Sequence, residues 1–243
     1  MTKNQQKLIK SLREKKNRTE LGLFLVEGSK NVLELLNTDF EIENLFITED
    51  FFKKNEFILK DQKFEPSTQA ELEKNGSLES NDSAIAIVKQ KENSSFKIED
   101  NEIILALDEV KDPGNLGTII RIADWYGIKK IVASKETADF YNSKVISATK
   151  GSFARVQIFY TDLVEFLSSQ KTQILGAYLD GENVHKTDFP TSGILVMGNE
   201  SKGISENIEK LVTKKITIPS FGKAESLNVA IATAIILDNW RKK

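Results

Sequence analysis

Short apolar runs alternate along the chain with longer amphipathic or polar stretches. The runs 84–88 and 103–107 contain only residues of the kind found in buried strands. Between such runs, apolar residues recur at three- and four-residue spacing and predict helices. Strands that alternate with helices are typical of α/β proteins, so the sequence predicts an α/β fold. Further strands are expected at 24–26, 42–47, 130–133, 155–159, 174–178, 194–197 and 215–219.

A polar stretch at 89–102 interrupts this alternation and is the best candidate for a linker. A chain of 243 residues is long enough for one large domain or two small ones. We therefore predict a small α/β domain at 1–95 and a second α/β domain at 96–243.

The first twenty residues are locally basic and are opposed only by Glu14 and Glu20. Leu8, Ile9 and Leu12 recur at helical spacing, which predicts one short amphipathic helix. Such a helix is either an ordinary solvated surface element or an arm that contacts RNA phosphates. The candidate RNA-binding residues are Lys3, Lys7, Lys10, Arg13, Lys15, Lys16 and Arg18.

Composition excludes several classes of site. The formal net charge is −2, so no global basic field draws the chain to nucleic acid. The chain has no cysteine and one histidine, which excludes disulfides, thiolate chemistry and multi-histidine metal sites. His185 is expected in a loop, and we predict no metal. No apolar run reaches the ~18 residues of a membrane span, so a cytoplasmic location is expected.

The segment 108–121 follows a predicted strand and carries candidate chemistry. Asp112 can cap a helix that has Pro113 in its first turn, and Gly114 allows close approach of a ligand or another segment. Asn115 and Arg121 then lie near the helix start, an arrangement that suits anion or nucleotide binding. Asp–Pro–Gly–Asn is also a common turn sequence, so this segment alone leaves both interpretations open.

Two later segments strengthen the functional interpretation. Residues 198–203 follow the strand 194–197, and ligands of open α/β sheets bind at such strand ends. Glu200 there can accept hydrogen bonds. Residues 218–229 connect the last strand to a helix, predicted at about 226–242, that is apolar nearly all round and suits a core or a subunit interface. Ser226 and Asn228 are polar groups at its entry.

Together these three segments resemble the three motifs of the SpoU (TrmH-type) RNA ribose 2′-O-methyltransferases of the SPOUT superfamily. The quoted residues are Asp112–Gly117 with Arg121–Asp124, Gly198–Gly203, and Ile218–Pro219 with Ser226–Ala230. The resemblance covers about residues 103–243. More loosely, the first half is similar to a small ribosomal RNA-binding protein, which suits a substrate-binding domain.

The resemblance implies a parallel sheet with a C-terminal trefoil knot and a homodimer formed through the knotted domain. It also implies S-adenosylmethionine as methyl donor and structured RNA as substrate; both rRNA and tRNA are substrates in the family, and we favour rRNA. By matching position, the reaction site would contain Arg121, Asn115, Glu200, Ser226 and Asn228. The donor would contact Gly198, Ile218, Leu227, Asn228, Met197 and Pro219.

Arginine is effectively always protonated, so Arg121 suits holding a phosphate and stabilising a developing alkoxide better than it suits a general base. In this hypothesis Asn115 orients its guanidinium. One alternative is a non-catalytic RNA-binding protein of the same architecture. A second is a protein that binds a nucleotide phosphate at Gly114–Gly117, but the chain lacks both common phosphate-loop motifs.

Overall fold

The computed structural model describes residues 1–242, and the chain forms two compact units. Unit 1 contains Met1–Glu92 together with Asp139–Ala154, and unit 2 contains Asn93–Ala138 and the chain from Arg155 onward. The sequence places 139–154 in the second domain, whereas in the structure these residues pack within unit 1. No helix in the described part of the chain is long and apolar enough to span a membrane.

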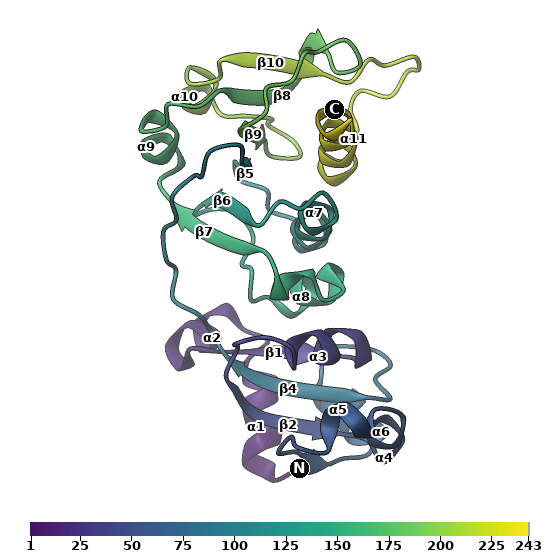
Figure 1. Ribbon diagram of the computed structural model, residues 1–243. Helices are drawn as coiled ribbons and strands as arrows, with labels where there is room; N and C mark the ends of the chain where they lie inside the picture. Colours follow the sequence, from purple (N-terminus) through teal and green to yellow (C-terminus); the bar gives the residue numbers. More distant parts are fainter. Residues whose placement is uncertain (243) are drawn as a thin grey trace. The chain divides into compact units, whose positions relative to one another are not determined.

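Unit 1 is built on a four-stranded sheet with helices packed against it (Figure 1). Its strands are β1 (Leu23–Glu27), β2 (Ile42–Ile47), β3 (Glu65–Pro66) and β4 (Ala84–Lys89). Its helices are α1 (Lys3–Ser11), α2 (Lys15–Leu21), α3 (Ser29–Leu35), α4 (Glu49–Lys54), α5 (Glu56–Leu59), α6 (Gln69–Asn75), α8 (Ser143–Thr149) and the short 3₁₀ helix η1 (Ser152–Ala154). The strand order is β1-β4-β2-β3, with β4 antiparallel to both its neighbours and β2 parallel to β3.

The basic N-terminal segment forms two helices, α1 and α2, where the sequence predicts one. The chain turns after Leu12, and Arg18 accounts for this turn. Its Nη1 donates to the carbonyl oxygens of Leu12 at 2.9 Å and Arg13 at 2.7 Å. A helix end leaves such carbonyls without partners, so the Arg18 guanidinium stabilises the break between the two helices.

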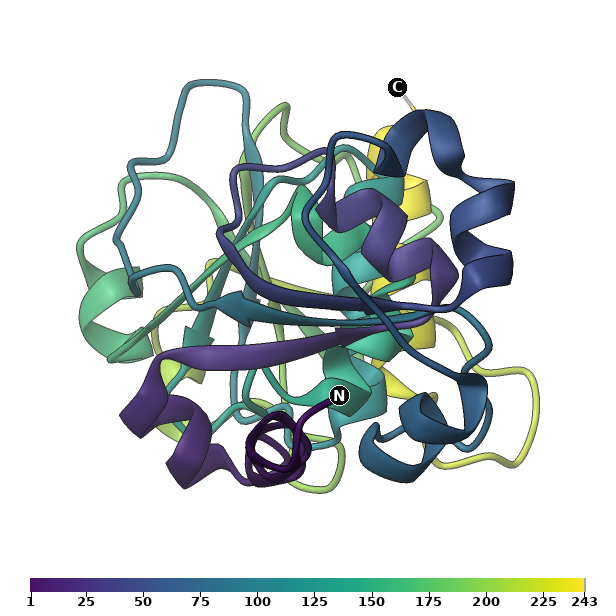
Figure 2. The ribbon, with the colours of Figure 1, turned by 90° about the horizontal axis from the view of Figure 1, so that it is seen from below.

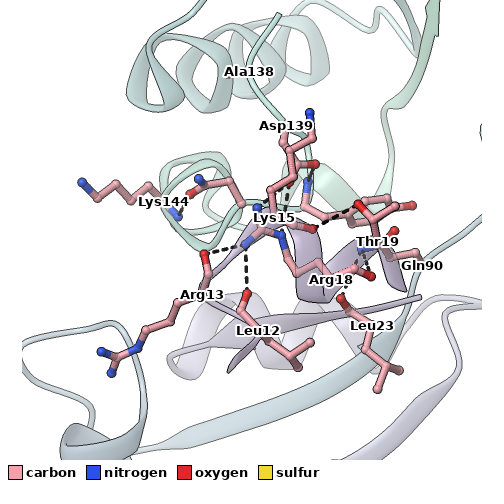
Figure 3. A network of polar contacts seen from close by, with 12 residues as sticks. Leu12, Arg13, Lys15, Arg18, Thr19, Leu23, Gln90, Ala138, Asp139 and Lys144 are labelled. Carbon is pink, nitrogen blue, oxygen red and sulfur yellow. Dashed lines mark hydrogen bonds and ion pairs between the residues drawn. The ribbon is translucent and has the colours of Figure 1, made fainter. Parts of the chain in front are cut away.

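Arg18 is also paired with Asp139, just before α8, as Figure 3 shows. Its Nε and Nη2 donate to Asp139 Oδ2 at 3.2 and 2.5 Å, and the arginine is only 2% exposed. Arg18 therefore anchors 139–154 on α2 and has no free guanidinium for RNA. The prediction that Arg18 contacts phosphate is corrected on this ground: the side chain is buried because it holds a helix end and a carboxylate.

Aromatic side chains complete the packing of 139–154 in unit 1. The Phe24 ring on β1 lies 4.6 Å from the Tyr141 ring, and Phe40 lies 6.1 Å from Phe153. Burial raises the pKa of the Tyr141 hydroxyl, which accepts a hydrogen bond from the Lys91 amide. These contacts between distant parts of the sequence explain why the segment belongs to unit 1.

Unit 2 is built on a six-stranded parallel sheet. Its strands are β5 (Ile103–Leu107), β6 (Lys130–Ser134), β7 (Gln157–Thr161), β8 (Ile174–Asn183), β9 (Gly193–Met197) and β10 (Lys214–Thr217). Its helices are α7 (Pro113–Trp125), α9 (Leu163–Ser168), α10 (Glu206–Glu209) and α11 (Val229–Arg241). The strand order is β10-β8-β9-β5-β6-β7, and every pairing is parallel. The predicted α/β fold with a parallel sheet is confirmed.

Helices cover both faces of this sheet, which is why its central strands are apolar throughout. Figure 1 shows α7 and α11 on one face and α9 and α10 on the other. Helices α7 and α11 pack side by side. In Figures 1 and 2, the yellow-green connection from β10 to α11 projects as an extended loop. Both ends of that loop belong to the third sequence motif.

Two helix starts in unit 2 follow from capping side chains. Asp112 Oδ1 accepts a hydrogen bond from the backbone N–H of Asn115 at 2.8 Å, and Pro113 occupies the first turn of α7, as predicted. Helix α11 begins at Val229, three residues later than predicted. Asn228 is the cause, because its Oδ1 accepts from the Ala230 and Ile231 amides at 2.9 and 3.3 Å.

Candidate functional site

The carboxyl ends of β5 and β9 lie side by side where the strand order of unit 2 reverses. β5 pairs with β6 on one side and with β9 on the other. The chain therefore runs from β5 toward β6 and β7 on one side of the sheet, whereas β8, β9 and β10 lie on the other side. Leu107 pairs with Met197, and the next amide, that of Asp108, donates to the Met197 carbonyl at 2.9 Å. Ligands of open α/β sheets bind at this kind of switch point. The first two motifs begin there.

Glu200 joins the second motif to the first. Its carboxylate accepts from the backbone amides of Lys111 at 3.3 Å and Asp112 at 3.2 Å, and from Asn115 Nδ2 at 3.0 Å. These three donors lie at the amino end of α7, where a carboxylate is stabilised by the helix dipole. Glu200 therefore fixes the position of the first motif.

The ionisation of Glu200 follows from the same contacts. Partial burial raises its pKa, but the hydrogen bonds from Asn115 and from the backbone amides outweigh burial and lower the pKa below its ordinary value. Glu200 is thus an anionic acceptor at neutral pH. It acts as an anchor in this arrangement and not as a proton donor.

Asn228 joins the third motif to the first. Its Nδ2 donates to Asn115 Oδ1 at 2.8 Å, while its Oδ1 caps α11. Asn115 therefore lies between Glu200 and Asn228, with both ends of its amide occupied. We call Asn115, Glu200 and Asn228 the strand-end site. The structure brings these three predicted residues together although they come from three separate segments.

The loop of the second motif is tightly folded around Gly198. A Cβ atom at this position would lie 2.3 Å from Gly203 C and 2.4 Å from Ile204 N, so only glycine fits. The Asn199 and Gly203 backbones exchange hydrogen bonds at 3.0 and 2.9 Å, and Gly203 has a φ of +72°. The loop is a fixed platform that presents Glu200.

Two polar residues that sequence reasoning missed hold this platform. Asp108 is buried and its Oδ2 accepts from the Ser205 amide at 2.7 Å. Asn199 Nδ2 donates to the Glu109 carbonyl at 2.8 Å, where Glu109 adopts a φ of +56°. A polar residue directly after β5, and one two positions after the end of β9, are the signals that point to Asp108 and Asn199.

Other predicted residues stand apart from this network. Arg121 is exposed on α7, and within residues 1–242 its guanidinium makes no hydrogen bond or ion pair. Among residues 1–242 the expected contact from Asn115 to Arg121 is absent, and the Asn115 side chain is instead held by Glu200 and Asn228. Ser226 is exposed as well, and across the same residues it has no hydrogen-bond partner.

The predicted donor-binding residues lie at or just beyond the ends of β9 and β10 and at the start of α11. Met197 is buried at the end of β9, and Ile218 and Pro219 are half-buried beyond β10. Leu227 is 48% exposed next to Asn228. In the part of the chain that the structure describes, the backbone of 218–227 forms no backbone–backbone hydrogen bond. Free amides and carbonyls beside apolar side chains fit a ligand with an adenine ring and an amino-acid moiety such as S-adenosylmethionine.

Two family models match the chain and together cover most of it. The model described as the SpoU rRNA Methylase family matches residues 102–238, which include all three motifs and the strand-end site. The chain belongs to the SpoU rRNA Methylase family. This membership confirms the family predicted from the motifs and makes the protein a methyltransferase. The other model, described as the MRM3-like substrate binding domain, matches residues 3–93.

One curated relative aligns over nearly the whole chain, and another aligns over little more than half of it. The 23S rRNA (guanosine(2553)-2'-O)-methyltransferase RlmP of Bacillus subtilis is 29% identical, over 96% of this chain and 94% of its own. The tRNA (guanosine(18)-2'-O)-methyltransferase of Aquifex aeolicus is 35% identical, but over only 56% of this chain and 67% of its own.

Solved structures of the family share the fold of the complete chain. A TrmH-family protein from Porphyromonas gingivalis has a TM-score of 0.87 and 33% identity, covering 100% of this chain and 98% of its own. An AdoMet-bound rRNA methyltransferase from Sinorhizobium meliloti has a TM-score of 0.85 and 29% identity, covering 100% and 95%. The second structure carries the methyl donor that the motifs of this chain predict.

Proposed function

We propose that the protein transfers a methyl group from S-adenosylmethionine to a ribose 2′-hydroxyl of ribosomal RNA. The observation that carries this proposal is the strand-end site: Asn115, Glu200 and Asn228 join three motifs of a methyltransferase family at the switch point of the sheet. Ribosomal RNA is favoured over tRNA because the relative that aligns along both parts of the chain is named for 23S rRNA.

The methyl donor, when bound, supplies an activated sulfonium methyl group, so the protein must position the ribose and help its hydroxyl lose a proton. In this proposal the donor is held by Gly198, Ile218, Leu227, Met197, Pro219 and Asn228. Arg121 holds an RNA phosphate and stabilises the developing alkoxide while the hydroxyl proton passes to water, since arginine itself stays protonated. Its guanidinium, which is exposed and has no polar partner within residues 1–242, supports this role.

The strand-end site acts by positioning. Glu200 and Asn228 fix the Asn115 amide from both sides, and this fixes the start of α7 on which Arg121 lies. Ser226, exposed one residue before Leu227, is available to the ribose or the donor. In this proposal the orientation of Arg121 comes from the RNA itself, not from Asn115.

A second copy of the chain covers the outer face of α7 and α11 in our proposal. Trp125 on α7 is 84% exposed and Ile231 on α11 is 53% exposed, and Leu227 continues this apolar surface to the donor site. A homodimer through these helices, a trefoil knot in the C-terminal part and a cytoplasmic location belong to the same proposal. Sedimentation of wild type and Ile231→Glu tests the dimer: the variant should be monomeric.

The function is tested by incubating the purified protein with methyl-labelled donor and with rRNA or tRNA from cells that lack the protein. We expect label in rRNA, at a single ribose resistant to alkaline cleavage. Label in tRNA alone would overturn the choice of substrate. RNA binding without any transfer would instead support the non-catalytic alternative.

A further inference from the structure

Helix α7 carries a potential competitor for Arg121. Asp124 lies three residues after Arg121, and residues with this spacing are neighbours on a helix surface. An arginine and an aspartate so placed attract each other. In the structure they nevertheless form no ion pair. Among the described residues, the Arg121 guanidinium makes no hydrogen bond or ion pair with any side chain.

Arg155 engages the Asp124 carboxylate instead. Its Nε lies 3.1 Å from both Asp124 Oδ1 and Oδ2, and its Nη2 lies 2.9 Å from Oδ2. The planar guanidinium thus uses two nitrogens on one carboxylate, the strong arrangement for such a pair. Both residues lie in unit 2, with Arg155 just before β7. The Asp124 side chain is only 24% exposed in this pair.

We propose that Arg155 is a positioning residue that withholds Asp124 from Arg121, so that Arg121 stays available to the phosphate and ribose of the RNA. This inference rests on the proposed role of Arg121. Without Arg155, the Asp124 carboxylate would pair with Arg121 and would also place a negative charge beside an incoming phosphate. Both effects oppose RNA binding and alkoxide stabilisation at Arg121.

The expected loss of activity corresponds to the interaction energy of a partly exposed charge pair. Loss of Arg155 should lower kcat/KM for RNA about two- to fivefold at low ionic strength. Salt screens exposed charges over about 10 Å at 0.1 M, so the defect should shrink as salt is added. A packing defect at the end of α7 would not depend on salt in this way.

The test compares Arg155→Gln, Asp124→Asn and the double variant Arg155→Gln/Asp124→Asn. We expect Arg155→Gln to lose activity, Asp124→Asn to keep it, and the double variant to recover the activity of Asp124→Asn. Recovery follows because the amide no longer competes for Arg121. A double variant as defective as Arg155→Gln, or an Arg155→Gln protein as active as wild type, would overturn the inference.

A second readout does not require activity. Phenylglyoxal modifies free guanidinium groups. Mass spectrometry of the peptide that contains Arg121 measures the rate at which this arginine is modified. The Arg121 rate should fall in Arg155→Gln and return in the double variant; an unchanged rate contradicts the inference. If these rates behave as expected but wild type transfers no methyl group, the proposed function fails while the pairing scheme stands.

Discussion

The strand-end site of unit 2 and the lysines of α1 and α2 in unit 1 are both proposed to serve one reaction, yet they are built in opposite ways. Asn115 is bonded to Glu200 and Asn228, which are 85 and 113 residues away in the sequence. By contrast, Lys3, Lys7, Lys10 and Lys15 form no ion pair within residues 1–242, and Lys16 lies 3.8 Å from Glu20. Chemistry at a fixed atom needs a fixed geometry, whereas contact with an RNA backbone tolerates mobile charges.

The two arginines of the same N-terminal segment sharpen this contrast. Arg13 is exposed, but its Nη2 donates to the carbonyls of Asn75, at 3.1 Å, and Gly76. Arg18 is buried against Asp139. Both guanidinium groups therefore stabilise unit 1, and of the seven candidate residues the five lysines, one of them in an exposed pair with Glu20, remain available to RNA. Composition alone treats all seven residues as equivalent.

Arg121→Ala should have the largest effect. Removing the charge that stabilises the developing alkoxide should lower kcat about 10²- to 10³-fold. Affinity for S-adenosylmethionine should not change, because the predicted donor contacts lie elsewhere. Arg241→Ala, which removes an exposed arginine at the end of α11, is the matched control. Turnover of Arg121→Ala within a few-fold of wild type would remove Arg121 from the reaction.

Arg18→Met should affect stability instead of chemistry. Breaking a buried pair leaves Asp139 without its charge partner and the Leu12 and Arg13 carbonyls without this donor, at a cost of about 3 kcal/mol in the free energy of unfolding. Urea unfolding measures this cost, with Lys15→Met as the exposed control. If Arg18→Met is as stable as the control and binds RNA less tightly, Arg18 belongs with the lysines after all.

Substitutions at Asn228 separate its cap from its contact with Asn115. Asn228→Ala removes both and should cost about 1 kcal/mol in stability. Asn228→Asp keeps an oxygen to cap α11 but cannot donate to Asn115 Oδ1. We expect both variants to lose about tenfold in kcat, since small misplacements of positioning groups are costly. Full activity of a stable Asn228→Asp protein would show that the Asn115 contact is dispensable.

The smallest effect per residue should come from the lysines. If about four of them contact phosphates, log affinity for RNA should fall with log salt at a slope of about −3 to −4. Replacing Lys3, Lys7 and Lys10 by glutamine should reduce that slope by about two to three units. The control replaces Lys54, Lys60 and Lys63, three exposed lysines elsewhere in unit 1. Equal slopes for the two triple variants would contradict the predicted arm.

Sequence reasoning succeeded where the structure depends on local patterns. The buried strands, the cap at Asp112 and the glycine at 198 all follow from residue type and spacing. The sequence also placed Asn115, Glu200 and Asn228 near one another, through the family resemblance. It missed Asp108 and Asn199, because a polar residue after a strand has many possible partners.

Long-range pairing is what local patterns leave undetermined. Arg18 and Asp139 are 121 residues apart, and nothing in either segment indicates the other. The same holds for Arg155 and Asp124, since a helix surface residue such as Asp124 is ordinarily solvated. The expected Asn115–Arg121 contact failed for a related reason: two distant residues, Glu200 and Asn228, fix the Asn115 side chain in another position.

A calorimetric titration of S-adenosylmethionine into the purified chain tests most directly the claim that three distant loops form one donor site. We predict saturable binding at one site per chain, with the same affinity in wild type and Arg121→Ala. The absence of saturable binding up to about 1 mM donor would contradict the claim.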